Sequence, residues 1–308
     1  MKLFLLFLDG VGIGATNPDH NPFFRANLRT LRGLLDGELP HLRSRNHEGK
    51  HSVCFGVDAN LGVDGLPQSG TGQASIFTGE NAARHFGKHF GPYIPTTLRP
   101  MVAEKNLFTR VRKAGKRALL VNAFPEPFFE YTQSGTRRLS ATTFASLSAG
   151  LPLLTAHDLA SNRAVSADFV RNRWPEMGHQ DVLPVSAHDA GIHCASLVRE
   201  NDFTVFDYWL PDHAGHSQDM DRAVRVLDLF DEFLDGVMTG TDLRDTVILG
   251  ISDHGNIEDL RTKSHTRNPS LGFLVGRRRE AAQRIRSLTD VAPFVSECLN
   301  ISSTHMGG

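Results

Sequence analysis

The sequence has 308 residues, of which 40% are hydrophobic, so the chain can bury one large core or a large core with a smaller insert. Lysine and arginine number 33 against 34 for aspartate and glutamate, and the formal net charge is -1. This balance excludes the strong positive charge typical of nucleic-acid-binding proteins. We therefore expect a globular protein with no nucleic-acid partner.

The cysteines and the N-terminal run indicate the compartment. Cys54, Cys194 and Cys298 are odd in number, widely spaced and without a CxxC pair, which argues against a disulfide framework and a cysteine-ligated zinc site. The apolar run 3–8 is too short for a signal peptide or a membrane span, and no other segment reaches spanning length. We expect a cytoplasmic protein that does not associate with membranes.

Short apolar runs alternate with amphipathic stretches along the chain. This alternation predicts an α/β fold, a mostly parallel sheet with helices on both faces. Continuous apolar runs such as 3–8 and 247–251 are typical of strands that are covered on both sides. The predicted strands are residues 3–8, 51–57, 117–122, 203–209, 246–252 and 272–276.

Two helices and a division of the chain are also predicted. Apolar residues recur at spacings of three and four over 217–238, and a second helix is expected over 103–114. The middle is richer in Ser, Thr, Arg and Pro and has no long apolar strand. We predict a metal-binding core over 1–124 and 187–300, a small cap or insertion over 125–186, and a flexible tail over 301–308.

Carboxylates and imidazoles stand at the ends of several predicted strands. Because the carboxyl ends of strands in an open α/β sheet form the ligand crevice, we expect these groups at one rim. A single aspartate there is more often a turn former or a helix cap, but the whole set suits Zn²⁺ or Mn²⁺ and is large enough for two ions. The residues are Asp9, Asp207, Asp212, His216, Asp253, His254 and His265.

The order of these residues resembles a known family. Asp9 after the first strand, a serine in a glycine-containing turn, then PDHAGH, SDHGN and SHTRNP resemble the metal-site pattern of the alkaline phosphatase superfamily. The branch most similar is that of cofactor-independent phosphoglycerate mutase and phosphopentomutase, and SLTDVAPFVSECL resembles its closing helix. The resemblance covers the start of the chain, the serine turn and most of 202–300, but not the middle.

The resemblance implies two divalent ions and a nucleophile. One ion would be held by Asp212, His216 and His265, and the other by Asp9, Asp253 and His254, with Ser69 bridging toward them. Asp207 is left as a supporting group or a sheet-end residue without a catalytic duty.

The turn LPQSGTGQASIFTG contains the hydroxyl that matches the family's nucleophile. Ser69 stands three residues before Gly72, as in the family, and Thr71 is the reserve candidate. Either hydroxyl could instead only cap a helix. Metal coordination would make a serine hydroxyl an effective nucleophile, and the helix N-terminus would hold phosphoryl oxygens.

The resemblance implies a metal-dependent phosphoester hydrolase that acts on a small anionic phosphorylated substrate and forms a phosphoserine at Ser69. Gln73 stands where mutases of this branch carry a histidine, and the insert between Ser69 and Asp212 is shorter than that of phosphoglycerate mutase. Both departures favour hydrolysis over a phosphomutase acting on a sugar phosphate or phosphoglycerate. A phosphodiesterase or nucleotide pyrophosphatase and an inactive metal-binding module are further alternatives.

Basic side chains near the rim are candidate substrate contacts. They could recognise a phosphate or carboxylate, although a solvated basic loop is nearly as good an interpretation. The candidates are Arg84, His85, Lys88, His89 and Arg267.

Overall fold

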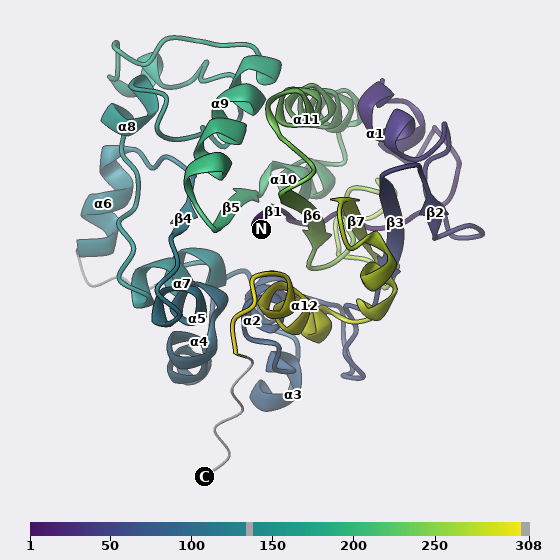
Figure 1. Cartoon of the computed structure of the whole chain (residues 1–308). Helices are drawn as coiled ribbons and strands as arrows, with labels where there is room; N and C mark the ends of the chain where they lie inside the picture. The colour runs from purple at the N-terminus through teal and green to yellow at the C-terminus, as the bar shows by residue number, and fades with distance from the viewer. Residues whose placement is uncertain (134–137, 303–308) are drawn as a thin grey trace.

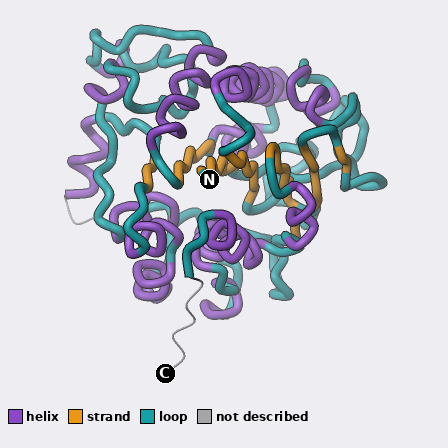
Figure 2. Tube along the Cα trace, in the orientation of Figure 1, coloured by secondary structure: helices purple, strands orange, loops and turns teal. Residues whose placement is uncertain are grey.

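A mixed sheet runs through the middle of the molecule between two layers of helices (Figures 1 and 2). The computed structural model describes residues 1–133 and 138–302, and among these the sheet has seven strands in the order β2-β3-β7-β6-β1-β5-β4. The strands are β1 (Lys2–Leu8), β2 (His47–Glu48), β3 (Ser52–Val57), β4 (Ala118–Leu120), β5 (Phe203–Tyr208), β6 (Thr246–Ser252) and β7 (Ser270–Gly276).

Strand direction decides which loops meet at one edge of the sheet. β1 pairs in parallel with β5 and β6, and β4 pairs in parallel with β5. β7 is antiparallel to both β6 and β3, and β2 is antiparallel to β3. Five strands, β1, β3, β4, β5 and β6, therefore run in one direction, and the predicted mostly parallel sheet is confirmed. Because β7 runs against these five strands, its start lies at the same edge as the carboxyl ends of β1, β5 and β6.

The central strand β1 is apolar on both faces. Leu3, Leu5 and Phe7 belong to the hydrophobic cluster on one side of the sheet, and the alternate residues Phe4 and Leu6 belong to the cluster on the other. All five are completely buried. The alternation follows from the two-residue period of a strand, and helices cover both faces as predicted.

The helices form one layer above and one below the sheet in the view of Figure 1, with two more beside β4. The first layer holds α1 (Arg29–Leu34), α9 (Ala187–Glu200), α10 (Leu210–Ser217) and α11 (Met220–Gly240). The second holds α2 (Ser69–Thr78), α3 (Ala82–Phe86), α4 (Arg99–Lys105), α5 (Leu107–Lys113), α7 (Ala141–Ser148) and α12 (Val291–Cys298). Beside β4 lie α6 (Glu126–Gln133) and α8 (Ala156–Ala160). Short 3-10 helices span Pro22–Phe24, Thr96–Leu98, Pro175–Met177, Arg279–Arg284 and Leu288–Asp290.

Two predicted helices are wrong in their bounds. The single helix expected over 103–114 is two helices, because Asn106 has an extended backbone and its side chain accepts from the amide of Thr109 at the start of α5. The helix expected from residue 217 begins at Met220, since Gln218 has a left-handed φ of 54° and Asp219 caps α11.

The middle segment contributes to more than one part of the fold. α7 packs against α2 in the layer below the sheet. A separate small apolar cluster holds Ala123, Leu159, Ala164, Trp174 and Val182. The boundaries of a cap at 125 and 186 stay a prediction. Of the predicted tail 301–308, Ile301 is buried and residues 303–308 lie outside the described residues. In the described part of the chain, no helix is long and apolar enough to cross a membrane.

Candidate metal centre and nucleophile

The predicted ligands meet at the sheet edge where β1, β5 and β6 end. Asp9 directly follows β1, and Asp253 and His254 directly follow β6. Asp212 and His216 lie one turn apart on α10, which starts two residues after β5. His265 comes from the loop before β7 and reaches the same edge because β7 is antiparallel. The topology thus explains how residues from four segments come together.

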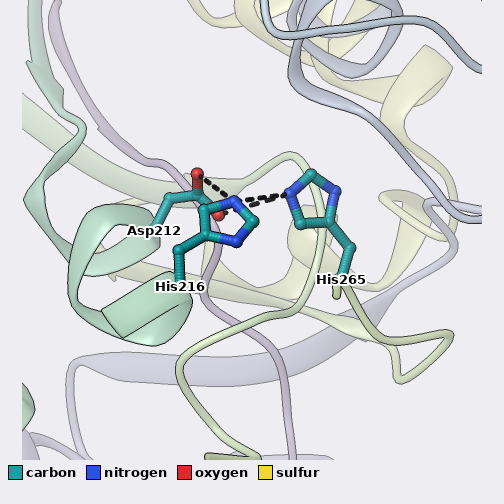
Figure 3. Close-up of side chains that lie close together, drawn as sticks. All are labelled: Asp212, His216 and His265. Carbon is teal, nitrogen blue, oxygen red and sulfur yellow. Dashed lines mark hydrogen bonds and ion pairs between the residues drawn. The ribbon is translucent and has the colours of Figure 1, made fainter. Parts of the chain in front are cut away.

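Asp212, His216 and His265 form the first cluster, shown in Figure 3. The Nε2 atom of His216 lies 3.2 Å from Asp212 Oδ2, and the Nε2 atom of His265 lies 3.5 Å from Asp212 Oδ1. The two Nε2 atoms are 3.2 Å apart. A zinc ion held tetrahedrally at about 2.0–2.1 Å from each nitrogen would set its ligand atoms roughly 3.3 Å apart, so these spacings fit one ion.

The other ring nitrogens of this cluster fix the tautomers. The Nδ1 atom of His216 lies 2.6 Å from the carbonyl oxygen of Lys263, and that of His265 lies 2.7 Å from the carbonyl oxygen of Pro67. Each Nδ1 must donate a proton to its carbonyl, so in the neutral rings both Nε2 lone pairs face one another. Two facing lone pairs repel unless a cation lies between them, and a histidine that donates to a carbonyl through its far nitrogen is typical of metal sites.

Ser69 lies in the second cluster. Its hydroxyl is 3.0 Å from His254 Nε2 and donates to Asp9 Oδ1 at 3.4 Å. His254 Nε2 also lies 3.4 Å from Asp9 Oδ1 and 3.7 Å from Asp253 Oδ2. Ligand atoms of Asp9, His254 and Asp212 lie within 4.8 Å of one another, so Asp212 stands between the two clusters.

Burial and close neighbours shift the pKa values of the carboxyl groups at this edge of the sheet. Burial, and then the neighbouring Asp253 and Asp212, raise the pKa of Asp9 well above its ordinary value. Burial and the charge of Asp212 raise the pKa of Asp253 in the same way. Burial opposes ionisation of Asp212, but hydrogen bonds from His216 and Asn256 lower its pKa below the ordinary value. Burial lowers the pKa of His254 to about 3, so its ring is neutral.

The donor set fits divalent metal ions. In the part of the chain that the structure describes, the basic side chains within 4.0 Å of the Asp9, Asp212 and Asp253 carboxylates are all histidines, of which His254 is neutral. Asp253 Oδ2 is buried without a hydrogen-bond partner. Buried carboxylates are costly unless they are paired or bind a metal. Carboxylate oxygens and neutral imidazoles are ligands that Zn²⁺ and Mn²⁺ accept.

The turn before α2 delivers Ser69 to this rim. Ser69 is the first residue of α2, and the preceding Gln68 makes no side-chain cap. The amide of Thr71 donates to the carbonyl of Phe90 at 2.9 Å, which leaves the amides of Ser69 and Gly70 available to an anion. Glycines at positions 70 and 72 allow the start of α2 to pack closely against Tyr93 and Asp253. A Cβ atom at Gly70 would lie 2.2 Å from the carbonyl oxygen of Tyr93, and one at Gly72 would lie 3.0 Å from Asp253 Cβ.

The two other polar residues of the turn have structural partners. The Thr71 hydroxyl donates to the carbonyl of Gln68 at 3.2 Å and accepts from the amide of Phe90, away from the ligands. Gln73 donates to Asp9 Oδ2 at 3.4 Å and accepts from the hydroxyl of Thr142 at 3.3 Å. The geometry therefore favours Ser69 over Thr71 as the nucleophile, and it makes Gln73 a support for Asp9.

A cavity of about 490 Å³ opens beside Asp9, Gln73 and Asp207 and extends among residues of the middle segment. Burial raises the pKa of Asp207 to about 7. Arg138 and Arg173 line the cavity, and neither is among the predicted substrate contacts. From the sequence, Arg138 and its neighbour Arg137, which lies outside the described residues, could reach toward the site, but an exposed pair is the favoured interpretation.

The basic residues predicted to contact substrate lie elsewhere. In the described part of the chain, none of them lines this cavity. His85 forms an ion pair with Glu80 at 3.5 Å, and His89 Nε2 lies 3.1 Å from the carbonyl of Asn60. Their role in substrate binding stays a prediction for Arg84, His85, Lys88, His89 and Arg267.

Two supporting residues were also missed. Asn256 donates to Asp212 Oδ1 at 2.7 Å and orients that carboxylate. Glu258 is buried, accepts from the amide of Gly12 at 3.0 Å and bonds the hydroxyl of Thr266, so it joins the loop after β1 to the loop that carries His265. Asn256 belongs to the SDHGN motif, and its place in that motif is the sequence feature from which its role beside Asp212 could have been predicted.

Comparison with known proteins agrees with this geometry. A family model described as the metalloenzyme superfamily matches residues 184–303. This match confirms the predicted resemblance to the alkaline phosphatase superfamily for this part of the chain. The matched region contains both the α10 ligands and the loops after β6 and before β7.

Curated proteins similar to this chain are named 2,3-bisphosphoglycerate-independent phosphoglycerate mutase. That from Moorella thermoacetica is 30% identical over 135 residues, 41% of this chain and 26% of the relative. That from Antithamnion sp. is 28% identical over 109 residues, 32% of this chain and 21% of the relative. The chain thus matches only about a quarter of the length of these relatives.

Solved structures share the fold over nearly the whole chain. The PH0037 protein from Pyrococcus horikoshii has a TM-score of 0.60 at 13% identity, and the superposition covers 99% of this chain and 98% of the PH0037 chain. Alkaline phosphatase from the Antarctic bacterium TAB5 has a TM-score of 0.52 at 10% identity, and the superposition covers 97% of this chain and 98% of the phosphatase chain. At these identities the likeness establishes the fold alone.

Proposed function

We propose that the protein is a two-metal phosphoryl-transfer enzyme that hydrolyses a phosphate ester through a phosphoserine at Ser69. The observation that carries the proposal is the position of the Ser69 hydroxyl, 3.0 Å from His254 Nε2 and 3.4 Å from Asp9 Oδ1, at the start of α2. A serine held among metal-ligand side chains at a helix N-terminus is suited to attack a bound phosphoryl group.

The residues at this edge of the sheet would have different roles in catalysis. Asp212, His216 and His265 would hold one ion, and Asp212 also groups with Asp9 and His254. Asp9 and His254 would hold the other ion together with Asp253, whose Oδ2 lies 3.7 Å from His254 Nε2. Bound Zn²⁺ or Mn²⁺ would lower the pKa of the Ser69 hydroxyl and neutralise phosphoryl oxygens. Ser69 Oγ forms the bond to phosphorus as the alcohol leaves, and a water molecule then cleaves the phosphoserine. The amides of Ser69 and Gly70 at the start of α2 would hold phosphoryl oxygens during both steps.

Gln73 favours hydrolysis over mutase chemistry. Its amide is engaged with Asp9 and Thr142 and has no group that can transfer a proton at neutral pH. A phosphomutase acting on a sugar phosphate or phosphoglycerate is the second candidate, because the curated relatives carry the name of a mutase. Release of inorganic phosphate supports the hydrolase, whereas an isomerised phosphate ester without phosphate release supports the mutase.

The test is turnover of p-nitrophenyl phosphate and of a p-nitrophenyl phosphodiester by metal-stripped protein refilled with Zn²⁺ or Mn²⁺. We expect metal-dependent monoester hydrolysis that is lost in Ser69→Ala, with a fall of at least ~10³-fold, and retained in Thr71→Ala. Preference for the diester would instead indicate a phosphodiesterase or nucleotide pyrophosphatase. Failure to turn over either ester or any phosphoglycerate would indicate an inactive metal-binding module.

A further inference from the structure

The cavity beside Asp9 has walls that the proposed chemistry does not need. Its lining is dominated by large apolar and aromatic side chains, namely Tyr93, Phe124, Phe128, Trp174, Met177 and Trp209. Its volume of about 490 Å³ lies within the range of about 300–1,000 Å³ typical of small-molecule pockets. A phosphoryl group alone would fill only a small part of it.

Exposed apolar side chains gather at this cavity. Tyr93, Met177 and Trp209 are 39%, 43% and 37% exposed. Among the described residues, the other large hydrophobic side chains exposed to this degree are Met1, Leu42, Leu147 and Leu183. Three of seven therefore line one cavity, and apolar surface gathered in this way marks a binding site.

Parts of the wall are held rigidly. The Trp174 Nε1 donates to Ser166 Oγ at 2.8 Å, and Trp174 is only 4% exposed. Phe128 of α6 stacks on Phe124 with ring centroids 4.6 Å apart. A preformed aromatic wall loses little conformational entropy when it binds a ligand.

The apolar chamber is continuous with the candidate centre. Asp9, which accepts from the Ser69 hydroxyl, lines the same cavity, as do Gln73 and Asp207. A phosphate ester with its phosphorus near Ser69 would therefore extend its alcohol portion between the aromatic walls.

We propose that this cavity binds the alcohol portion of the substrate, and that the substrate is a phosphate ester of a ring-sized, largely apolar alcohol. The inference rests on the proposed function, because it takes the Ser69 end as the place of the phosphoryl group. A small polyhydroxylated alcohol or hydroxy acid would leave the aromatic walls facing water. Polar side chains such as Asn122, Arg138 and Asp168 also line the cavity, and the proposed alcohol is therefore largely and not wholly apolar.

Binding can be measured without turnover in metal-loaded Ser69→Ala. The probes are phenylphosphonate and methylphosphonate, which share a charged head and differ in the ring. The chain has two tryptophans, Trp174 and Trp209, and both line the cavity, so intrinsic fluorescence reports its occupation directly. We expect phenylphosphonate to bind on the order of tenfold more tightly than methylphosphonate, because its ring is removed from water.

Matched variants locate the ring. Phe128→Ala and Met177→Ala are expected to weaken phenylphosphonate binding severalfold and to leave methylphosphonate binding unchanged. The control is Leu183→Ala, a residue that is 68% exposed and outside the cavity, which should change neither. Equal affinities for the two phosphonates, or equal weakening of both in Phe128→Ala and Met177→Ala, would overturn the proposal.

A parallel assay on the unsubstituted enzyme separates this inference from the function on which it rests. If phenyl phosphate and methyl phosphate are hydrolysed with equal kcat/KM, the phosphatase stands and the apolar-substrate proposal fails. If phenylphosphonate binds more tightly but no ester is hydrolysed, the cavity proposal stands as a binding site and the hydrolase fails.

Discussion

At the residue scale, the facing Nε2 atoms of His216 and His265 are the strongest indication of a cation. Their Nδ1 protons are directed to the carbonyls of Lys263 and Pro67, and the two Nε2 atoms are 3.2 Å apart. Protonating one ring could also relieve this contact, and the Asp212 carboxylate does raise the pKa of His216. A metal ion satisfies all three side chains at once, so removal of one ligand should be visible in the metal content.

His216→Ala is expected to remove one of two bound ions per chain, with a loss of affinity at that site of at least ~10–100-fold. Metal analysis after dialysis against limiting Zn²⁺ measures the stoichiometry. The matched control is His213→Ala, which removes an exposed imidazole from the same helix and should leave two ions bound. Two ions retained at unchanged affinity in His216→Ala would contradict the assigned ligand set.

Gly70 is a second residue with a measurable steric role. In Gly70→Ala the new methyl group would lie 2.2 Å from the carbonyl oxygen of Tyr93, so the start of α2 must move and displace Ser69. We expect a loss of about 1–3 kcal/mol of stability together with most of the activity. Denaturant unfolding and p-nitrophenyl phosphate turnover measure the two effects.

The control for this variant is Gly33→Ala in α1. A Cβ atom there meets nothing within 4 Å, so the change should stabilise the protein by about 0.4–1 kcal/mol and leave turnover unchanged. If Gly70→Ala were as stable and active as Gly33→Ala, the close approach of α2 to Tyr93 would be wrong.

At the scale of elements, α1 depends on a carboxylate from another helix. Its own N-cap residue, Leu28, supplies no side-chain bond, and Asp231 of α11 instead accepts from the amides of Thr30 and Leu31 at 2.8 Å each. Asp231→Ala should therefore cost about 1–3 kcal/mol of stability, because it leaves these amides without partners.

Thermal and urea unfolding of Asp231→Ala measure this cost, with Asp235→Ala as the control. Asp235 lies on the same helix and makes a surface ion pair with His188 at 3.5 Å, so its loss should change stability by no more than about 0.5 kcal/mol. Equal effects of the two substitutions would show that the tertiary cap of α1 contributes nothing.

Elements differ in how far they can be predicted from the sequence. β1 and β6 are continuous apolar runs buried on both faces, and the prediction of both is confirmed within one residue. The break at Asn106 was missed because the cap depends on a backbone conformation that an apolar pattern does not record. The two-residue β2 was missed because it is too short for any periodicity.

At the scale of the whole molecule, topology brings together ligands that are distant in the sequence. The motifs placed Asp9, Asp212 and Asp253 after strands, and this was enough to predict a shared rim. The apolar cavity could not be predicted, because its walls come from several segments around Tyr93, Phe128 and Trp209 that have no common pattern. The candidate ligands can therefore be predicted from local motifs, whereas the pocket that would select a substrate depends on how the middle segment folds.

Metal binding should stabilise the whole chain. Removal of the ions leaves buried carboxyl groups of Asp9, Asp212 and Asp253 close together, and ions at 100 times their Kd would contribute roughly 2.7 kcal/mol per site. We expect chelation to lower Tm by several degrees and Zn²⁺ or Mn²⁺ to restore it. In His216→Ala, re-addition of metal should raise Tm by less than in the unsubstituted protein. An unchanged Tm on chelation of metal-loaded protein would argue against ions that are part of the fold.

The most direct test of the central claim is capture of the phosphoserine. Metal-loaded protein is mixed with p-nitrophenyl phosphate, quenched in acid within the first turnover and examined by peptide mass spectrometry. We expect one phosphoryl group per chain on the peptide with Ser69, present in Thr71→Ala and absent in Ser69→Ala. Turnover with no phosphopeptide, or with phosphate on Thr71, would contradict Ser69 as the nucleophile.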